Sequence, residues 1–436
     1  MTDTIIALSS GALPSGIAIV RASGTASGAL AERFCGALPA PRTAALRVFR
    51  DDEALEIDRG YVLWLPGPAS FTGEDCVEFH LHGSRAVVDR VLDLATEMPG
   101  VRLAEAGEFA RRAFSNGKLD LVEAEALGDL ISAETEAQRR FAVELAGGAQ
   151  SSLYEDWRAR LLHARSMIEA EIDFSDEDDV PGSVSDRVWA DMRTMSDALS
   201  RHMDGERRGR IMRSGLQVAI VGVPNAGKST LLNAMAGSDR AIVSPEPGTT
   251  RDVVEARLDL GGHLVVLADT AGLRDEAGTV EGEGIRRAIQ RAAEADLVLH
   301  VSETGLFEMP QLPDGLAVWT VRTKADLTVD GARPVQAADY ALSAVTGEGL
   351  GALVAALTDF ARDRAGGSDL APGRARHMQH LAACKAHLID SLSEQLPLEL
   401  RAEHLRLAGE QLGRITGRID VEDMLGTIFS QFCIGK

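Results

Sequence analysis

An apolar stretch that runs directly into a glycine-rich loop constrains this chain more than any other feature. The segment reads LQVAIVGVPNAGKS over residues 216–229, and its last eight residues fit G-x-x-x-x-G-K-[ST] at every fixed position. In this pattern, backbone N–H groups surround a nucleotide phosphate, and the following helix N-terminus adds partial positive charge. Lys228 is then expected to reach the β- and γ-phosphates, and the Ser229 hydroxyl to bind Mg²⁺. The segment therefore predicts a phosphate-binding loop between a buried strand and a helix.

Two later motifs are expected to complete the phosphate and metal site. GTTRD at residues 248–252 supplies Thr250, whose hydroxyl can bind Mg²⁺ and whose N–H can reach the γ-phosphate. DTAG at residues 269–272 follows an apolar strand. Its Asp269 would hold the metal through a water molecule, and its Gly272 N–H would contact the γ-phosphate. Each motif is weak alone, but this order is typical of GTPases.

A third motif predicts selection of the guanine base. TKAD at residues 323–326 ends the apolar strand 317–321. The Asp326 carboxylate can accept hydrogen bonds from guanine N1–H and N2–H₂, which adenine does not offer. Ser343-Ala344 would present a backbone N–H to guanine O6. The four motifs together predict a GTP-binding domain.

Two residues indicate which kind of GTPase this is. Leu273 stands where Ras-like enzymes have the glutamine that orients the attacking water, so another group must do that work. Asn225 precedes Ala-Gly-Lys in the loop, and its amide oxygen could coordinate a monovalent cation against the phosphates. The alternative is that Asn225 only braces the loop.

Composition and charge limit the compartment and the partners. With 436 residues the chain needs more than one domain, and its four scattered cysteines form no CxxC pair, which fits a reducing, cytoplasmic location. The start MTDTIIALSS lacks the basic region of a signal peptide, and no apolar run is long enough for a membrane span.

The net charge bears on how the chain could meet RNA. The formal charge of −21 excludes binding of nucleic acid through the average surface. Local basic patches are the candidates, either residues 201–213 or a late helix with Arg401, Arg406, Arg414 and Arg418. Solvated helix faces are the alternative for both.

The spacing of the apolar residues predicts a multidomain protein that combines α/β domains with an all-α domain. Residues 1–118 are expected to form a mixed α/β domain, residues 119–210 and 367–436 two parts of a helical domain, and residues 211–366 an inserted Ras-like GTPase domain. Strands are expected at residues 4–9, 16–21, 60–64 and 76–82, with a helix at 85–97. His80-x-His82 could be a metal pair, but no third ligand lies nearby in the sequence.

Longer segments resemble a known family. SFTGEDCVEFHLHGS at residues 70–84, GEFARRAFSNGKLDLVEAEAL at 107–127 and the ending GRITGRIDVEDMLGTIFSQFCIGK are similar to the tRNA modification GTPase MnmE (TrmE) family. Together with the GTPase motifs, the resemblance covers all three regions.

The resemblance implies a function for the regions outside the GTPase domain. The N-terminal domain would form a homodimer and bind a tetrahydrofolate one-carbon donor, either the 5-formyl or the 5,10-methylene form. Residues matching the folate contacts are Arg21, Glu78, Lys118 and Lys436. With a flavoprotein of the MnmG/GidA family, in a heterotetramer, the enzyme would place an aminomethyl-type group on C5 of the wobble uridine of certain tRNAs.

The resemblance also assigns roles in GTP hydrolysis. Asn225, Ser244, Glu246 and Thr249 match potassium ligands, and Glu281 matches the group that orients the attacking water. Thr323 replaces the usual asparagine, and its hydroxyl is expected to tie the base loop to the phosphate loop in the same way. The residues expected to bind GTP are Asn225, Ala226, Gly227, Lys228, Ser229, Thr230, Ser244, Thr249, Thr250, Asp269, Thr270, Ala271, Gly272, Thr323, Lys324, Asp326, Ser343 and Ala344, with Mg²⁺ on Ser229 and Thr250.

Cys433, near the end of the chain, has two interpretations. It could pack as a small hydrophobe, or it could act as a catalytic thiolate at the folate and uridine site. Two other functions compete with this interpretation of the whole chain. An RNA-binding or ribosome-assembly GTPase would need a KH-like appendage or a basic tail, neither of which is present. A one-carbon transfer enzyme that carries a GTPase switch merges with the first interpretation.

Overall fold

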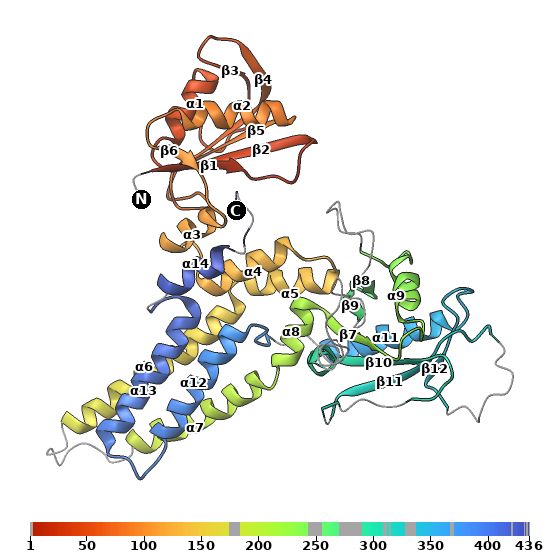
Figure 1. The fold of residues 1–436 in the computed structure, drawn as a ribbon. Helices are drawn as coiled ribbons and strands as arrows, with labels where there is room; N and C mark the ends of the chain where they lie inside the picture. Colours follow the sequence, from red (N-terminus) through yellow and green to blue (C-terminus); the bar gives the residue numbers. More distant parts are fainter. Residues whose placement is uncertain are drawn as a thin grey trace, which may run out of the picture. The chain divides into compact units, whose positions relative to one another are not determined.

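A computed structural model describes residues 3–173, 184–242, 255–269, 290–307, 312–313, 315–327, 337–366, 370–419, 422–430, 432 and 435 (Figure 1). The chain divides into two compact units. The first comprises Met1–Gly128, Ser151–Glu155 and Leu412–Lys436, and the second comprises Asp129–Gln150 and Asp156–Gln411. In the described part, no helix is long and apolar enough to cross a membrane.

The N-terminal region is a mixed α/β domain around one sheet of order β3-β4-β5-β2-β1-β6, in which only the β1–β6 pair is parallel. Its elements are β1 (Thr4–Leu8), β2 (Ser15–Ser23), α1 (Ser27–Cys35), β3 (Ala45–Arg50), β4 (Glu56–Leu65), β5 (Cys76–Gly83), α2 (Arg85–Thr96), β6 (Val101–Leu103) and α3 (Glu108–Ser115). The four expected strands and the expected helix are confirmed. The elements β3, β6, α1 and α3 were not predicted.

Alternation along β5 shows how this sheet is covered. Val77, Phe79 and Leu81 are buried in one core with residues of α1 and α2, so both helices cover the same face. Glu78 and His80 lie on the opposite face of the strand and are half-buried. Glu78, one of the residues expected to contact folate, therefore lies on the face of the sheet opposite to α1 and α2.

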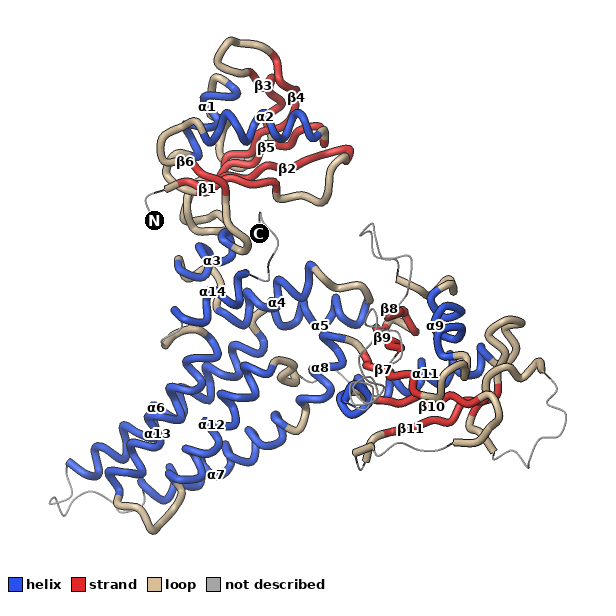
Figure 2. Tube along the Cα trace, viewed as in Figure 1, coloured by secondary structure: helices blue, strands red, loops and turns tan. Residues whose placement is uncertain are grey.

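The helical region is built from α4 (Leu121–Ile131), α5 (Glu136–Ala146), α6 (Ala149–Asp173), α7 (Val184–Met203), α8 (Glu206–Ser214), α12 (Ala375–Ser391), α13 (Leu398–Thr416) and α14 (Glu422–Ser430). Helix α12 packs against α7, and the long helices run side by side (Figure 2). Thr135 and Gln138 form a capping box that begins α5. In the first unit, Phe429 of α14 is buried in a core with residues of α3 and α4.

The GTPase domain has a six-stranded sheet of order β12-β11-β10-β7-β9-β8. Its elements are β7 (Leu216–Val221), α9 (Lys228–Ala236), β8 (Glu255–Leu260), β9 (His263–Asp269), β10 (Leu297–Ser302), β11 (Ala317–Arg322), β12 (Tyr340–Ala341) and α11 (Leu350–Ala365). All neighbouring pairs are parallel except the β8–β9 hairpin, whose turn residues Gly261 and Gly262 both have positive φ. The strands expected before the phosphate loop and before Asp269 and Thr323 are confirmed.

Candidate nucleotide-binding site

The phosphate loop lies at the carboxyl end of β7, an interior strand of the mostly parallel sheet. Strands β9 and β10 flank β7 on opposite sides, so this edge is the switch point at which open α/β sheets bind ligands. Gly222 has no room for a side chain, because a Cβ there would lie 2.3 Å from the Val301 carbonyl oxygen. Asn225 and Gly227 have φ of 63° and 89°, which turns the loop into the start of α9. The fold therefore requires glycine at 222 and favours it at 227 for backbone reasons alone.

Lys228 is held over the loop that it is expected to serve. Its Nζ donates hydrogen bonds to the carbonyl oxygens of Gly222 at 2.9 Å and Val223 at 3.0 Å, and the residue is buried. Burial lowers the pKa of the Lys228 ammonium from its ordinary value, and the nearby Asp269 carboxylate opposes that shift. The two hydrogen bonds hold the Lys228 ammonium against the phosphate loop. A bound phosphate would replace the two carbonyl oxygens as its partner.

The structure brings together two of the residues expected around Mg²⁺. The Ser229 hydroxyl donates to Oδ2 of Asp269 over 2.7 Å, although the two residues are forty positions apart. Asp269 is buried at the end of β9, and Ser229 is in the first turn of α9. A hydroxyl and a carboxylate in contact at a phosphate loop are oxygen donors of the kind that Mg²⁺ prefers.

Thr323 joins the base loop to the phosphate loop. The buried Thr323 hydroxyl donates to the Ala226 carbonyl oxygen at 2.6 Å, and the Thr323 N–H donates to the Ser302 carbonyl at 3.0 Å. The expected bond between the two loops is therefore present with threonine in place of asparagine.

Replacing Thr323 with valine should weaken GTP affinity about five- to tenfold, because the buried Ala226 carbonyl loses its partner. Turnover at saturating GTP should change little. Nucleotide titrations should show normal affinity for Thr323→Asn, because its side-chain amide can donate in place of the hydroxyl. Affinity should also be normal for Thr320→Val, because the Thr320 hydroxyl bonds to Asp339 and not to the phosphate loop. Unchanged affinity in Thr323→Val would show that the two loops are held by other contacts.

The residues expected to contact guanine lie on two neighbouring loops. Asp326 is exposed in a turn after β11, and the Lys324 ammonium is paired with Glu303 at 2.6 Å. The Ser343 N–H is engaged by the Glu348 carbonyl at 2.9 Å. Of the two residues expected to contact guanine O6, Ala344 is therefore the one whose N–H we expect to donate.

Several expected site residues lie outside the described residues. These are Ser244, Glu246, Thr249, Thr250, Thr270, Ala271, Gly272, Leu273, Glu281, Cys433 and Lys436.

The residues expected to bind folate are placed as follows. Arg21 on β2 donates two hydrogen bonds to Oε1 of Glu78 on β5, at 2.9 and 2.8 Å, and its guanidinium lies 5.5 Å from the centroid of the Phe71 ring. The aliphatic part of the exposed Lys118 lies beside Gly73. The structure thus pairs Arg21 with Glu78, while no contact joins Lys118 to either in the described part.

The end of the chain returns to this sheet within the first unit. The Ser9 hydroxyl donates to the Gly435 carbonyl oxygen at 2.8 Å, and a Cβ on Gly435 would lie 2.1 Å from the Leu8 carbonyl oxygen. Leu8 is paired with Val20 in the β1–β2 register, next to Arg21. No pattern in the sequence predicts this contact, because it joins residues more than four hundred positions apart.

The two arginine patches are largely engaged in contacts within the protein. Arg207 and Arg210 both bind the buried carboxylate of Asp296, at 3.0 and 2.5 Å. Arg401 lies 3.7 Å from the centroid of the Trp189 ring, and Arg418 pairs with Glu155 at 2.8 Å. These four arginines therefore have structural partners within the protein, a role that differs from both RNA binding and a solvated helix face.

Comparison with known proteins identifies the family. The family model "MnmE helical domain" matches residues 121–433, and the model "GTP-binding protein TrmE N-terminus" matches residues 4–118. The chain belongs to the tRNA modification GTPase MnmE family. It is 53% identical over 441 residues to the tRNA modification GTPase MnmE of Mesorhizobium japonicum, covering 100% of this chain and 99% of that one. The corresponding MnmE of Brucella anthropi is 51% identical over 441 residues, with the same coverage.

Among solved structures, the G domain of the T. maritima FeoB iron transporter is similar at 24% identity. It covers 34% of this chain and 99% of its own, with a TM-score of 0.24. The MnmE family assignment confirms the resemblance found in the sequence motifs and the GTPase class.

Proposed function

We propose that this tRNA modification GTPase hydrolyses GTP with Mg²⁺ and K⁺, and couples hydrolysis to modification of C5 of the wobble uridine. An aminomethyl-type group would be added with a tetrahydrofolate one-carbon donor. The enzyme would act in the cytoplasm as a homodimer, with a flavoprotein of the MnmG/GidA family and a tRNA substrate. Family membership at 53% identity over the whole chain supports the reaction class.

One observation carries the hydrolytic part of the proposal. The Ser229 hydroxyl and the Asp269 carboxylate are in contact at 2.7 Å, beside a lysine held over the phosphate loop. This arrangement offers a divalent ion two oxygen donors and offers the phosphates a cation. Thr250 would complete the metal site, and Glu281 would orient the attacking water that Leu273 cannot.

Asn225 supports the proposed potassium site. Its backbone has φ of 63° and its side chain is exposed at the phosphate loop, so its amide oxygen is accessible to an ion beside the phosphates. Ser244, Glu246 and Thr249 are proposed as the other ligands. A monovalent cation there would supply the positive charge that other GTPases take from an arginine finger.

Hydrolysis should be on the order of tenfold faster in KCl than in NaCl, because K⁺ has the larger radius that this proposed ligand set would fit. The two salts are compared at equal ionic strength, so that general screening is the same. Asn225→Ala should remove the difference, whereas Asn233→Ala, an exposed asparagine in α9, should keep it. Equal wild-type rates of hydrolysis in both salts would mean that Asn225 stabilises the loop and does not bind a cation.

The polar face of β5 supports the proposed folate site. Arg21 and Glu78 form a pair beside the ring of Phe71, so cationic, anionic and aromatic groups are held together on one side of the sheet. Glu78 could accept from a pterin N–H edge, and Arg21 and Lys118 could bind glutamate carboxylates. Gly435 lies against Leu8 and Ser9 near this pair.

The position of Gly435 also bears on the terminal residues. Cys433 and Lys436 are two and one positions from Gly435, which is in contact with β1 close to Arg21. This contact supports the proposal that Lys436 serves the folate site and that Cys433 acts on the reacting uridine. A role for the thiolate requires a lowered thiol pKa, for which Lys436 is the nearest cation in the sequence.

A further inference from the structure

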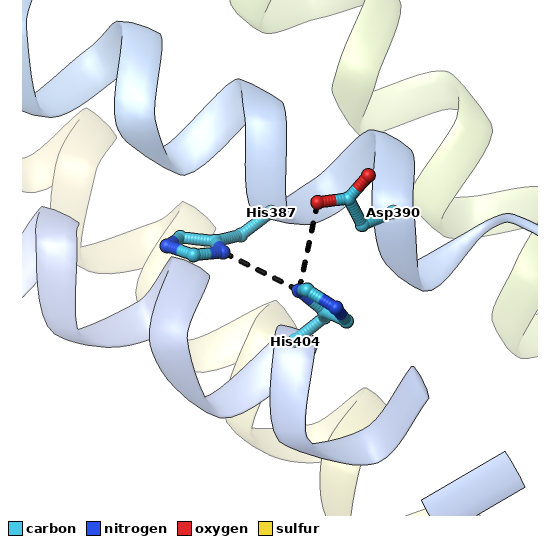
Figure 3. A group of neighbouring side chains, drawn as sticks. All are labelled: His387, Asp390 and His404. Atoms are coloured by element: carbon cyan, nitrogen blue, oxygen red, sulfur yellow. Dashed lines mark hydrogen bonds and ion pairs between the residues drawn. The ribbon is translucent and has the colours of Figure 1, made fainter. Parts of the chain in front are cut away.

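Three side chains that no GTPase role involves meet in the helical region. His387 and Asp390 come from the last turns of α12, and His404 comes from the second turn of α13. Figure 3 shows the two imidazoles and the carboxylate turned toward one another. Nδ1 of His387 lies 3.3 Å from Nδ1 of His404, which lies 3.8 Å from Oδ2 of Asp390. One donor atom from each side chain fits within 4.8 Å of the other two.

These separations match those of ligands around one tetrahedral metal ion. Zinc binds imidazole nitrogen at about 2.0–2.1 Å, so two ligand atoms of a tetrahedron are roughly 3.3–3.4 Å apart. The two imidazole nitrogens already have this separation, at 3.3 Å. The Asp390 carboxylate oxygen is 3.8 Å from the His404 nitrogen, and all three donor atoms lie within 4.8 Å of one another, so metal binding would require a rotation of the Asp390 side chain. Because the Asp390 side chain is 56% exposed, that rotation meets little resistance.

The backbone around the three side chains is held by other contacts. Arg401 at the start of α13 donates to the Ser391 carbonyl oxygen at the end of α12 over 2.7 Å, which closes the hairpin beside the cluster. The same guanidinium stacks on the ring of Trp189 at 3.7 Å from its centroid. The spacing of His387 and Asp390 is three residues along one helix, which places both on one face. The donor atoms are thus positioned by a fixed hairpin.

The plainer interpretation is an imidazole pair that shares one hydrogen bond. Two neutral imidazoles can make such a bond, in which one ring donates and the other accepts. That interpretation does not use Asp390, whose carboxylate supplies a third donor and a negative charge on the side of the pair. Two imidazoles and a carboxylate are also the ligand set of several three-residue zinc sites.

We propose that His387, Asp390 and His404 form a binding site for a divalent first-row transition ion, with zinc as the favoured ion. Two nitrogens and one oxygen from the protein leave one tetrahedral position for water. Imidazole ligands select against Mg²⁺, which prefers oxygen, so the site is distinct in chemistry from the Ser229–Asp269 pair. The bound ion joins the end of α12 to the start of α13.

The test is titration of the full-length, tag-free protein with Zn²⁺ and with Co²⁺. Excess Mg²⁺ and GDP are present throughout, so that the nucleotide site is occupied. Calorimetry should show one Zn²⁺ bound per chain, and Co²⁺ should give the intense visible absorption of a tetrahedral ion. His387→Gln and His404→Gln should each weaken binding by at least about tenfold, because each removes one of three ligands. Asp390→Asn should weaken binding less, because the amide oxygen can still coordinate.

A matched control comes from the same region. His163→Gln changes an exposed histidine on α6, and it should leave the affinity and the Co²⁺ spectrum unchanged. Circular dichroism and GTP turnover of all variants establish that each has folded. The proposal is overturned if the wild type binds neither ion under these conditions. It is equally overturned if the His387 and His404 variants bind as tightly as His163→Gln.

Discussion

Replacing Ser229 with alanine is expected to lower the rate of GTP hydrolysis by on the order of 10²-fold or more. The hydroxyl is in contact with Asp269 at 2.7 Å, and its removal takes one oxygen ligand from the proposed Mg²⁺ site. A metal that stabilises charge developing on the phosphates contributes several kcal/mol to the transition state, which corresponds to that loss in rate. Binding of GDP without Mg²⁺ should be nearly unchanged. Single-turnover hydrolysis and Mg²⁺ titration measure both effects.

A serine just after the same helix offers a matched control for Ser229. The Ser238 hydroxyl, just beyond the other end of α9, donates to the Met235 carbonyl oxygen at 2.7 Å and faces no phosphate loop. Ser238→Ala should therefore hydrolyse GTP at the wild-type rate. Wild-type turnover in Ser229→Ala, with unchanged dependence on Mg²⁺, would mean that the metal is held elsewhere.

Replacing Asp326 with asparagine is expected to lower GTP affinity by on the order of 10²-fold, because two hydrogen bonds to a charged acceptor are lost. The variant should gain affinity for xanthosine triphosphate, whose carbonyl at C2 can accept from the new amide. Asp326 is exposed, so the substitution should leave folding intact. Competition between the two nucleotides measures the preference directly.

A second carboxylate in the domain provides the comparison for Asp326. Asp339 accepts hydrogen bonds from the N–H and the hydroxyl of Thr320, at 2.7 and 2.8 Å, and is assigned no contact with the base. Asp339→Asn can affect stability but should keep the preference for GTP. If Asp326→Asn kept that preference as well, the base would have to bind at another loop.

The GTPase domain could be predicted from sequence because its chemistry is local. Each motif is contiguous and follows a strand, so the period of the apolar residues fixes both the fold and the position of the motif. The bond between the base loop and the phosphate loop was expected from the family resemblance, since a hydroxyl can replace an amide as a donor, and the structure identifies the Ala226 carbonyl oxygen as its acceptor. The alternation of apolar and polar residues along β5 is local in the same way, so the polar face of this strand can be read from its own sequence.

Contacts between distant segments could not be predicted in this way. The pairing of His387 and Asp390 with His404 depends on how two helices pack, and no spacing in the sequence indicates it. The contact of Gly435 with Ser9 depends on the path of the whole chain. The ion pairs of two arginines with the buried Asp296 carboxylate could not be predicted for the same reason.

The most direct test of the proposed function is mass spectrometry of wobble uridines in tRNA from a strain that lacks this chain. We predict that C5 of these uridines is unmodified in that strain and is modified again when the wild-type chain is restored. Ser229→Ala and Arg21→Ala should each fail to restore it, the first through GTP hydrolysis and the second with normal GTP turnover. Wobble uridines that remain fully modified in the strain without the chain would contradict the account.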